Sequence, residues 1–250
     1  SNNKGDIRIV GNESETDGGA FALHNSELRI TDNTGTIIFE DNKARYGGAV
    51  AALGRDSRVS IVDNDADVVF RNNTADEAAS ILSEGCVEIC NNGNVLFECA
   101  PGHQAVIHMR VSEDAVYGQD MLILSAAEGK TITFDNALIY IETSDNRNLV
   151  DVKLNNDYGN TPQSGTILFT NGSTASLKRA NQSLANGLLV LEKESKMSIG
   201  NDFTASGDII LTGESSLTVG DEMGIAHNSI QMADSEMSAN HIVGIHVQMA

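Results

Sequence analysis

A two-part motif recurs about every thirty residues in the first third of the chain. Phe-x-x-Asn is followed by Gly-Gly-Ala and a hydrophobic residue. The residues that make up these motifs are Gly18, Gly19 and Ala20, then Phe39 and Asn42, then Gly47, Gly48 and Ala49, then Phe70 and Asn73. A fixed period of this size, with turn-forming residues in every unit, indicates a solenoid whose repeats are stable because they stack on their neighbours.

Short alternating segments predict three strands in each repeat. The first set of aligned segments is residues 28–33, 59–64 and 87–92. The second set is residues 36–39, 67–70 and 94–97, which end at a Phe. The third set begins at the Gly-Gly-Ala element and is residues 49–53 and 80–82. Apolar and polar residues alternate in them, and no helical period lies between them. We therefore predict an all-β, right-handed parallel β-helix with three short strands per coil, the handedness following the usual crossover preference.

The repeat loosens in the second half of the chain. We interpret residues 1–250 as one solenoid, with an irregular insertion at about 110–129 and an alternative boundary near residue 155. Strands after that point recur at about ten-residue spacing. The stretch Thr174–Ala185 is the most compatible with a helix, and we expect it to form a protruding loop.

The motif residues have structural roles that follow from their chemistry. The Phe is expected to fill the coil interior, and paired glycines permit a corner that no side chain could enter. Turn asparagines tolerate left-handed backbone angles and bond to neighbouring backbone. Because stacked strands lie about 4.8 Å apart, aligned Asn33, Asn64 and Asn92 are predicted to form a ladder of side-chain amides.

The charge balance excludes two classes of partner. With 35 acidic and 16 basic residues, the formal net charge is −19, which disfavours nucleic acid and anionic membranes because both require cationic contacts. The charge indicates a self-repelling surface, with calcium binding by clustered carboxylates as the alternative. No apolar run reaches the roughly 18 residues that span a bilayer, so the chain is not expected to cross a membrane itself.

Two groups of charged residues could carry chemistry. Asp63, Asp65 and Asp67 would project to one face of an extended strand, where they could form a glycosidase carboxylate pair or hold calcium. A solvated turn is the alternative that we favour. A basic group could flank such a groove, although no catalytic signature accompanies it: Lys43, Arg45, Arg55 and Arg58.

The cysteines and histidines fit no metal-binding spacing. Cys86, Cys90 and Cys99 lack a fourth ligand at an obvious distance. They are expected to be buried thiols, with a disulfide or intermolecular cross-linking as the alternative. The histidines that we considered form neither His-x-Glu nor His-Glu-x-x-His: His103, His108, His227, His241 and His246. We predict no metal site, no cofactor and no catalytic residue.

Phe-x-x-Asn alternating with Gly-Gly-Ala-[Ile/Leu/Val] resembles the hallmark of the chlamydial polymorphic membrane proteins. Phe39–Asn42, Gly47–Val50 and Phe70–Asn73 match it fully, whereas Ala78–Ile81 has lost the glycines. The resemblance covers roughly residues 5–110. It implies an autotransporter passenger on the bacterial outer membrane or secreted from it. A signal peptide and a β-barrel translocator would then lie outside this chain, which starts at Ser1 and is interpreted as an excised segment.

The function that this resemblance implies is adhesion. The partners would be a host-cell surface protein or glycan, with self-association into homo-oligomers left open, and the protein would not be an enzyme. Residues 101–130 and 172–187 are the segments expected to make contact with a partner. A carbohydrate-active β-helical enzyme and a structural spacer are the alternatives, since fold does not determine function.

Overall fold

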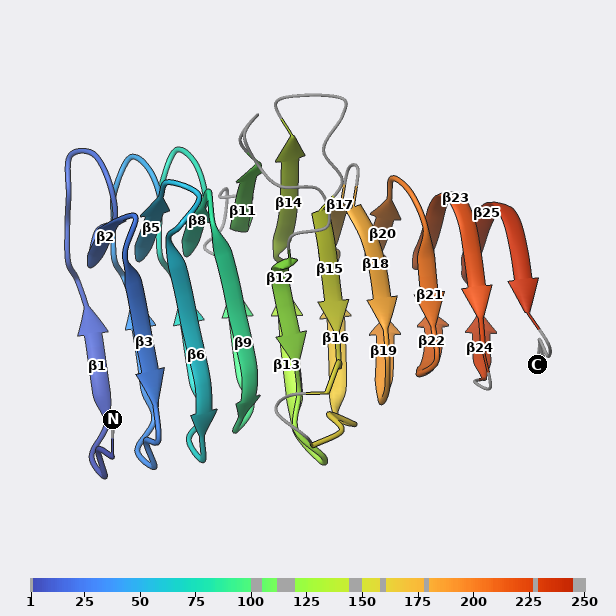
Figure 1. Ribbon diagram of the computed structural model, residues 1–250, viewed down its shortest axis with the longest axis horizontal. Helices are drawn as coiled ribbons and strands as arrows, with labels where there is room; N and C mark the ends of the chain where they lie inside the picture. Colours follow the sequence, from blue (N-terminus) through green and yellow to red (C-terminus); the bar gives the residue numbers. More distant parts are fainter. Residues whose placement is uncertain are drawn as a thin grey trace.

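The computed structural model describes residues 2–99, 105–111, 120–143, 150–157, 161–177, 180–226 and 229–244, and within them every regular element is a β-strand. The strands form an elongated solenoid with the N-terminus at one end and the C-terminus at the other (Figure 1). From left to right in Figure 1, the chain rises in the fainter strands and descends in the nearer ones, which is a right-handed coil. The predicted parallel β-helix is confirmed.

Successive coils place their strands in three rows. The first row is a nine-stranded parallel sheet made of β1 (Ile7–Val10), β4 (Ile37–Glu40), β7 (Val68–Arg71), β10 (Val95–Glu98), β13 (Thr131–Asp135), β16 (Thr166–Thr170), β19 (Leu188–Leu191), β22 (Asp208–Thr212) and β24 (Ile230–Ala233). The second row contains β2 (Phe21–His24), β5 (Val50–Leu53), β8 (Ile81–Ser83), β11 (Ala105–Val111), β14 (Leu138–Thr143), β17 (Thr174–Leu177) and β20 (Lys196–Ile199).

The third row completes each coil. It contains β3 (Glu27–Thr31), β6 (Arg58–Asn64), β9 (Cys86–Asn92), β12 (Asp120–Ser125), β15 (Val150–Leu154), β18 (Ala180–Leu184) and β21 (Phe203–Ala205). Near the C-terminal end β23 (Ser216–Ile225) is long enough to pair with both β20 and β21, and β25 (Glu236–Gly244) pairs with β23. The second and third rows therefore merge into one sheet there, and the coil is reduced from three strands to two.

The core is a column of side chains that recurs at the same register in each coil. Phe39, Phe70, Phe97, Phe134 and Phe169 are fully or almost fully buried. Their rings stack at centroid distances of 4.4, 4.7, 5.1 and 4.8 Å. Beyond Phe169 the column continues with Leu191, Leu211 and Met232. The Phe of the motif thus fills the interior, where each ring contacts the equivalent ring of the next coil.

Coil length varies along the rod and is shortest toward the C-terminal end, whereas in the middle Val95 pairs with Ile132, 37 residues on. Ile37 pairs with Val68, 31 residues on, whereas Leu189 pairs with Ile209, 20 residues on. The difference lies in the connections, because the strands themselves stay short. This is the physical basis of the shorter spacing seen in the second half of the sequence.

Two segments differ from expectation. Thr174–Ala185 is not a protruding loop, because β17 and β18 take their places in the second and third rows. Ala175, Leu177, Ala180 and Leu184 of these strands are buried in the core. Within the expected insertion at 110–129, Asp120–Ser125 is a regular strand whose Met121, Leu122 and Leu124 are buried. Residues 112–119 lie outside the described residues. The rows continue past residue 155, since β15 pairs with both β12 and β18.

Candidate functional site

The motif asparagines form two ladders at two corners of the coil. At the corner after the first row, Asn12 Nδ2 donates to Asn42 Oδ1 at 2.8 Å, and Asn42 Nδ2 donates to Asn73 Oδ1 at 2.9 Å. At the corner after the third row, Asn33 Nδ2 donates to Asn64 Oδ1 at 2.8 Å, and Asn64 Nδ2 donates to Asn92 Oδ1 at 2.7 Å. Asn33, Asn42, Asn64, Asn73 and Asn92 are buried. These five amides hold corners together inside the wall, whereas Asn12 in the first coil is exposed.

The residue before each ladder asparagine adopts left-handed backbone angles. Asp41 has φ 55° and Asn72 has φ 52° at one corner, while Asp63 has φ 56° and Asn91 has φ 51° at the other. Asp and Asn tolerate this conformation better than other residues with a side chain. The recurrent Asp-Asn and Asn-Asn pairs are therefore turn signals, with one residue for the bend and the next for the ladder.

The Gly-Gly-Ala element makes a corner with two separate requirements. Gly47 has φ 63°, and a Cβ on it would lie 2.1 Å from the Val50 carbonyl oxygen. Gly48 has an ordinary backbone, but a Cβ there would lie 2.1 Å from the Ala79 carbonyl oxygen of the next coil. The first glycine therefore allows the bend, and the second allows the coils to approach. Gly18 and Gly19 repeat this geometry one coil earlier.

After the first row, short arches join Asn42 to the Gly47–Gly48 corner and Asn73 to the equivalent Ala78–Ala79 corner. The arches stack through β-bridges between Lys43 and Thr74 and between Tyr46 and Glu77. They lie over the outer face of the second row, because Arg110 of β11 contacts Glu77 and sits 5.2 Å from the Tyr46 ring centroid. This cover accounts for the burial of the outward-facing Leu82.

His108 lies in the polar cluster under these arches. Its Nδ1 is 3.7 Å from Glu77 and its Nε2 is 3.5 Å from Glu142, and its ring tilts against Tyr140 at 5.1 Å. The side chain is largely buried, so desolvation lowers the pKa of His108, although Glu77 and Glu142 oppose the shift. Burial of this histidine was not evident from its lone position in the sequence. His103, His227 and His246 lie outside the described residues, and His241 is in β25.

The three aspartates singled out in the sequence do not share a strand face. Asp63 bends the chain at the end of β6, and Asp65 and Asp67 lie in the exposed turn that follows. Asp63 accepts from Asn91 Nδ2 at 2.9 Å, and Asp67 accepts from the Asn94 backbone at 2.7 Å. The extended geometry is therefore wrong, and the solvated turn describes these residues. The described residues hold no cluster of three His, Cys, Asp or Glu suited to a metal ion.

The four basic residues face separate partners rather than one groove. Lys43 pairs with Glu13 at 2.9 Å, Arg58 with Glu88 at 2.7 Å, and Arg55 with Asp56 at 3.8 Å. Arg45 lies 4.9 Å from the ring centroid of Tyr46. These four residues therefore do not converge on one groove.

The cysteines are thiols within the wall of the coil. Cys86 and Cys90 share one face of β9, but four residues of strand separate them by about 13 Å, too far for a disulfide. Cys90 and Cys99 are buried, and desolvation raises the pKa of both thiols. These two thiols are therefore protonated at neutral pH and are poor nucleophiles.

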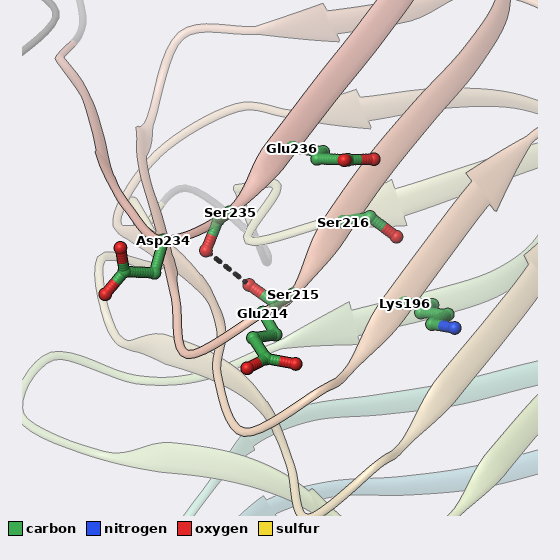
Figure 2. Close-up of a pocket in the computed structure, with 7 residues that line it drawn as sticks. All are labelled: Lys196, Glu214, Ser215, Ser216, Asp234, Ser235 and Glu236. Carbon is green, nitrogen blue, oxygen red and sulfur yellow. Dashed lines mark hydrogen bonds between the residues drawn. The ribbon is translucent and has the colours of Figure 1, made fainter.

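A hollow near the C-terminal end belongs to a serine ladder that was not anticipated. It is lined by Lys196, Glu214, Ser215, Ser216, Asp234, Ser235 and Glu236 (Figure 2). The buried Ser215 Oγ donates to the Leu191 carbonyl at 2.9 Å and lies 3.3 Å from Ser235 Oγ. Figure 2 shows the carboxylates of Glu214 and Asp234 and the amine of Lys196 pointing to different sides. The hollow therefore lacks a convergent set of reactive groups.

This serine ladder occupies the corner that asparagines hold in the first coils. The Ser173 hydroxyl donates to the Phe134 carbonyl at 2.8 Å, just as Asn73 Nδ2 donates to the Phe39 carbonyl at 3.0 Å. The sequence signal was a serine directly before β17, β20, β23 and β25: Ser173, Ser195, Ser215 and Ser235. The serine turn is one residue longer than the asparagine turn, because Ser173 follows Phe169 by four residues whereas Asn42 follows Phe39 by three.

Comparison with known proteins gives one informative similarity. The chain is 28% identical over 180 residues to a probable outer membrane protein, PmpD, of Chlamydia trachomatis. The match covers 68% of this chain but 9% of that protein, so the chain spans a small part of its relative's length. It confirms the resemblance to the chlamydial polymorphic membrane proteins that the repeated motifs indicate.

Two other comparisons, with family models and with solved structures, found no match. No family model matches the sequence. No solved structure matches it. Among the described residues, no helix is long and apolar enough to span a membrane.

Proposed function

We propose that this chain is a binding segment of a surface-exposed autotransporter passenger that attaches to a host-cell protein or glycan. The observation that carries the proposal is the combination of an uninterrupted β-helical rod with similarity to PmpD. A rod of stacked coils presents long, regular faces outward, which suits recognition by an extended surface. It acts by binding rather than catalysis, because its candidate carboxylates and cations are dispersed over separate contacts.

The segments expected to make contact with a partner would offer it strand faces more than loops. Within 101–130 and 172–187 the described residues are mostly strands of the wall. Binding therefore uses the outer strand faces and the arches, where side chains recur at coil spacing. This favours a partner that contacts several coils at once.

Cell binding tests the proposal. The labelled chain is titrated onto cultured epithelial cells and onto a glycan array, with a heat-unfolded sample as the control for non-specific adsorption. We expect saturable binding to cells that unlabelled chain displaces. Linear, non-saturable binding on both surfaces would contradict adhesion and leave a spacer role. Turnover of an acidic polysaccharide would instead indicate an enzyme.

A further inference from the structure

The outer face of the first-row sheet carries an aliphatic stripe that runs along the rod. The strands pair in continuous register, so the central outward residue of each strand stacks on that of the next coil. From β4 to β22 these central residues are Ile38, Val69, Leu96, Thr133, Leu168, Val190 and Ile210. Six of the seven are aliphatic. We call all seven residues, including Thr133, the stripe.

The stripe is not buried by the rest of the described molecule. In β7, β10, β16, β19 and β22 the stripe residue is partly exposed. The residues directly before and after it point inward and are buried. Only Ile38 is close to fully covered, at 9% exposure. A solvent-facing strand position normally carries a polar residue when the sheet covers a core on one side.

The other two rows show that the stripe is not a general feature of this wall. In the second row the corresponding outward residues of the later strands are Ser176, Ser198 and Thr218. In the third row they include Glu88, Lys153 and Ser183. Apolar residues in the outward register therefore persist along the first row alone, although all three rows enclose the same core. A contiguous exposed apolar strip of this kind marks an interaction surface.

Acidic residues border the stripe on both sides. The next outward positions are those two residues before and two residues after each stripe residue, in β4 to β22 or directly beside these strands. The carboxylates at these positions are Glu40, Asp67, Glu98, Asp135, Glu192 and Asp208. At these same positions the single cation is Arg71, which bonds Glu40 at 2.6 Å. Two cations from outside these positions also pair with the border, Arg8 with Glu40 at 3.5 Å and Lys193 with Glu192 at 3.6 Å, which leaves most of its carboxylates without a salt bridge to a cation of the described residues. The face is therefore apolar along its centre and negatively charged along its edges. Its complement is an apolar strip with Lys or Arg on both edges.

The direction of the stripe selects the shape of that complement. The stripe crosses the strands, so an extended segment lying along it would find no free backbone groups to pair with. Six coil steps of about 4.8 Å give a length of about 29 Å, equal to about 19 residues of α-helix. One helical turn of 5.4 Å approximates one coil step, and a helix packed on a sheet face is a standard layer arrangement.

We propose that the outer face of the first-row sheet binds a cationic amphipathic helix of a partner protein. The helix would place its apolar stripe on Val69, Leu96, Leu168 and Val190, and its lysines or arginines would extend to the bordering carboxylates. A second copy of this chain is a poorer occupant, because face-to-face packing would bring two sets of acidic edges together. The inference rests on the proposed adhesive function and names the surface and partner chemistry for it.

A synthetic helix tests the surface directly. The probe is a 20-residue peptide with leucines at helical spacing and lysines on both sides of them, titrated against the whole chain in 150 mM salt. A peptide of the same composition in scrambled order lacks the stripe, and one with glutamates in place of lysines lacks the charge complement. We expect the striped cationic peptide to bind at least tenfold more tightly than either control. Equal binding of the scrambled peptide would overturn the proposal.

Variants locate the binding face. The double variant Leu96→Thr, Leu168→Thr keeps strand-compatible residues and is expected to weaken peptide binding at least tenfold. Ile123→Thr makes the same kind of change on the outer face of β12 and is expected to alter it less than twofold. Glu98→Lys changes only an exposed edge residue and should weaken binding about threefold. Unchanged binding in both the double variant and Glu98→Lys would overturn the proposal.

Two further readouts separate the alternatives. If sedimentation shows a dimer that Leu96→Thr, Leu168→Thr abolishes, the stripe is occupied by a second copy and the helix proposal is wrong. If the wild-type chain binds cells and the stripe variants bind them equally, adhesion stands and the stripe does not mediate it. If the chain does not bind cells, adhesion fails, and the peptide titration still decides the stripe.

Discussion

The backbone conformation at each corner of this solenoid determines which residue types fit there. Gly18, Gly47 and Ala78 hold the same corner with φ of 52°, 63° and 57°. The third coil therefore places a side chain where the first two place none. An L-residue in this conformation costs about 1–2 kcal/mol, so Ala78 is a local weakness that the surrounding coils tolerate.

Replacing Ala78 with glycine is expected to stabilise the protein by about 1 kcal/mol, because the left-handed penalty is removed. The measurement is the urea midpoint of unfolding. The matched change Gly47→Ala should lower the midpoint, because its Cβ would lie 2.1 Å from the Val50 carbonyl oxygen. A lower midpoint for Ala78→Gly would show that the backbone there does not need glycine.

His108 is expected to make stability depend on pH. Burial lowers the pKa of His108 in the folded state, so the unfolded chain binds a proton more readily than the folded one. Stability is therefore complete above the unfolded value of about 6.5 and is lost as the pH falls from there toward the folded pKa. Urea unfolding at pH 7.5 and pH 5.5 measures this loss. The variant His108→Leu should lose less stability over that interval, and an equal loss in both proteins would refute the assignment.

At the scale of elements, ladders of side chains link one coil to the next. Asn64 has 1% exposure, donates to the carbonyls of Ile30 and Val62 and to Asn92, and accepts from Asn33. The residues that carry these groups are all buried in the wall. A ladder asparagine thus satisfies the polar groups of two neighbouring turns at once.

Asn64→Ala is expected to destabilise the protein by about 3 kcal/mol, because several buried donors and acceptors lose their partner. Asp65→Ala, at the exposed neighbour, should change stability by less than about 0.5 kcal/mol. Chemical denaturation of both variants measures the difference. Similar small effects for both would mean that water replaces the amide at this corner.

At the scale of the whole molecule, charge opposes the regular stacking. The chain carries a net charge of −19 on a slender rod, and some carboxylates lie beside those of the next coil, as Glu98 does beside Asp135. Self-repulsion of this kind destabilises the folded state and is screened by salt. The hydrophobic column and the ladders offset it.

Raising sodium chloride from about 10 mM to about 200 mM is therefore expected to raise the urea midpoint, since the Debye length falls from about 30 Å to below 10 Å. The double variant Asp65→Asn, Asp67→Asn should show a smaller salt effect, because it removes two charges from an exposed turn. A midpoint that stays constant or falls with salt would show that attractive ion pairs such as Arg58–Glu88 dominate instead.

The sequence by itself determined the repeat, the strands of the first coils and the inward position of Phe39 and Phe70. The apolar residues recur there with a fixed period, and this pattern sets the register in which one coil pairs with the next. It did not reveal the strands at Asp120–Ser125 and Thr174–Leu177, which form because neighbouring coils offer backbone partners. Tertiary structure also decided that Asp63, Asp65 and Asp67 diverge, that His108 is buried and that outward aliphatic residues align into a stripe. Each of these depends on which coil stacks on which, and that register is a property of the assembled rod.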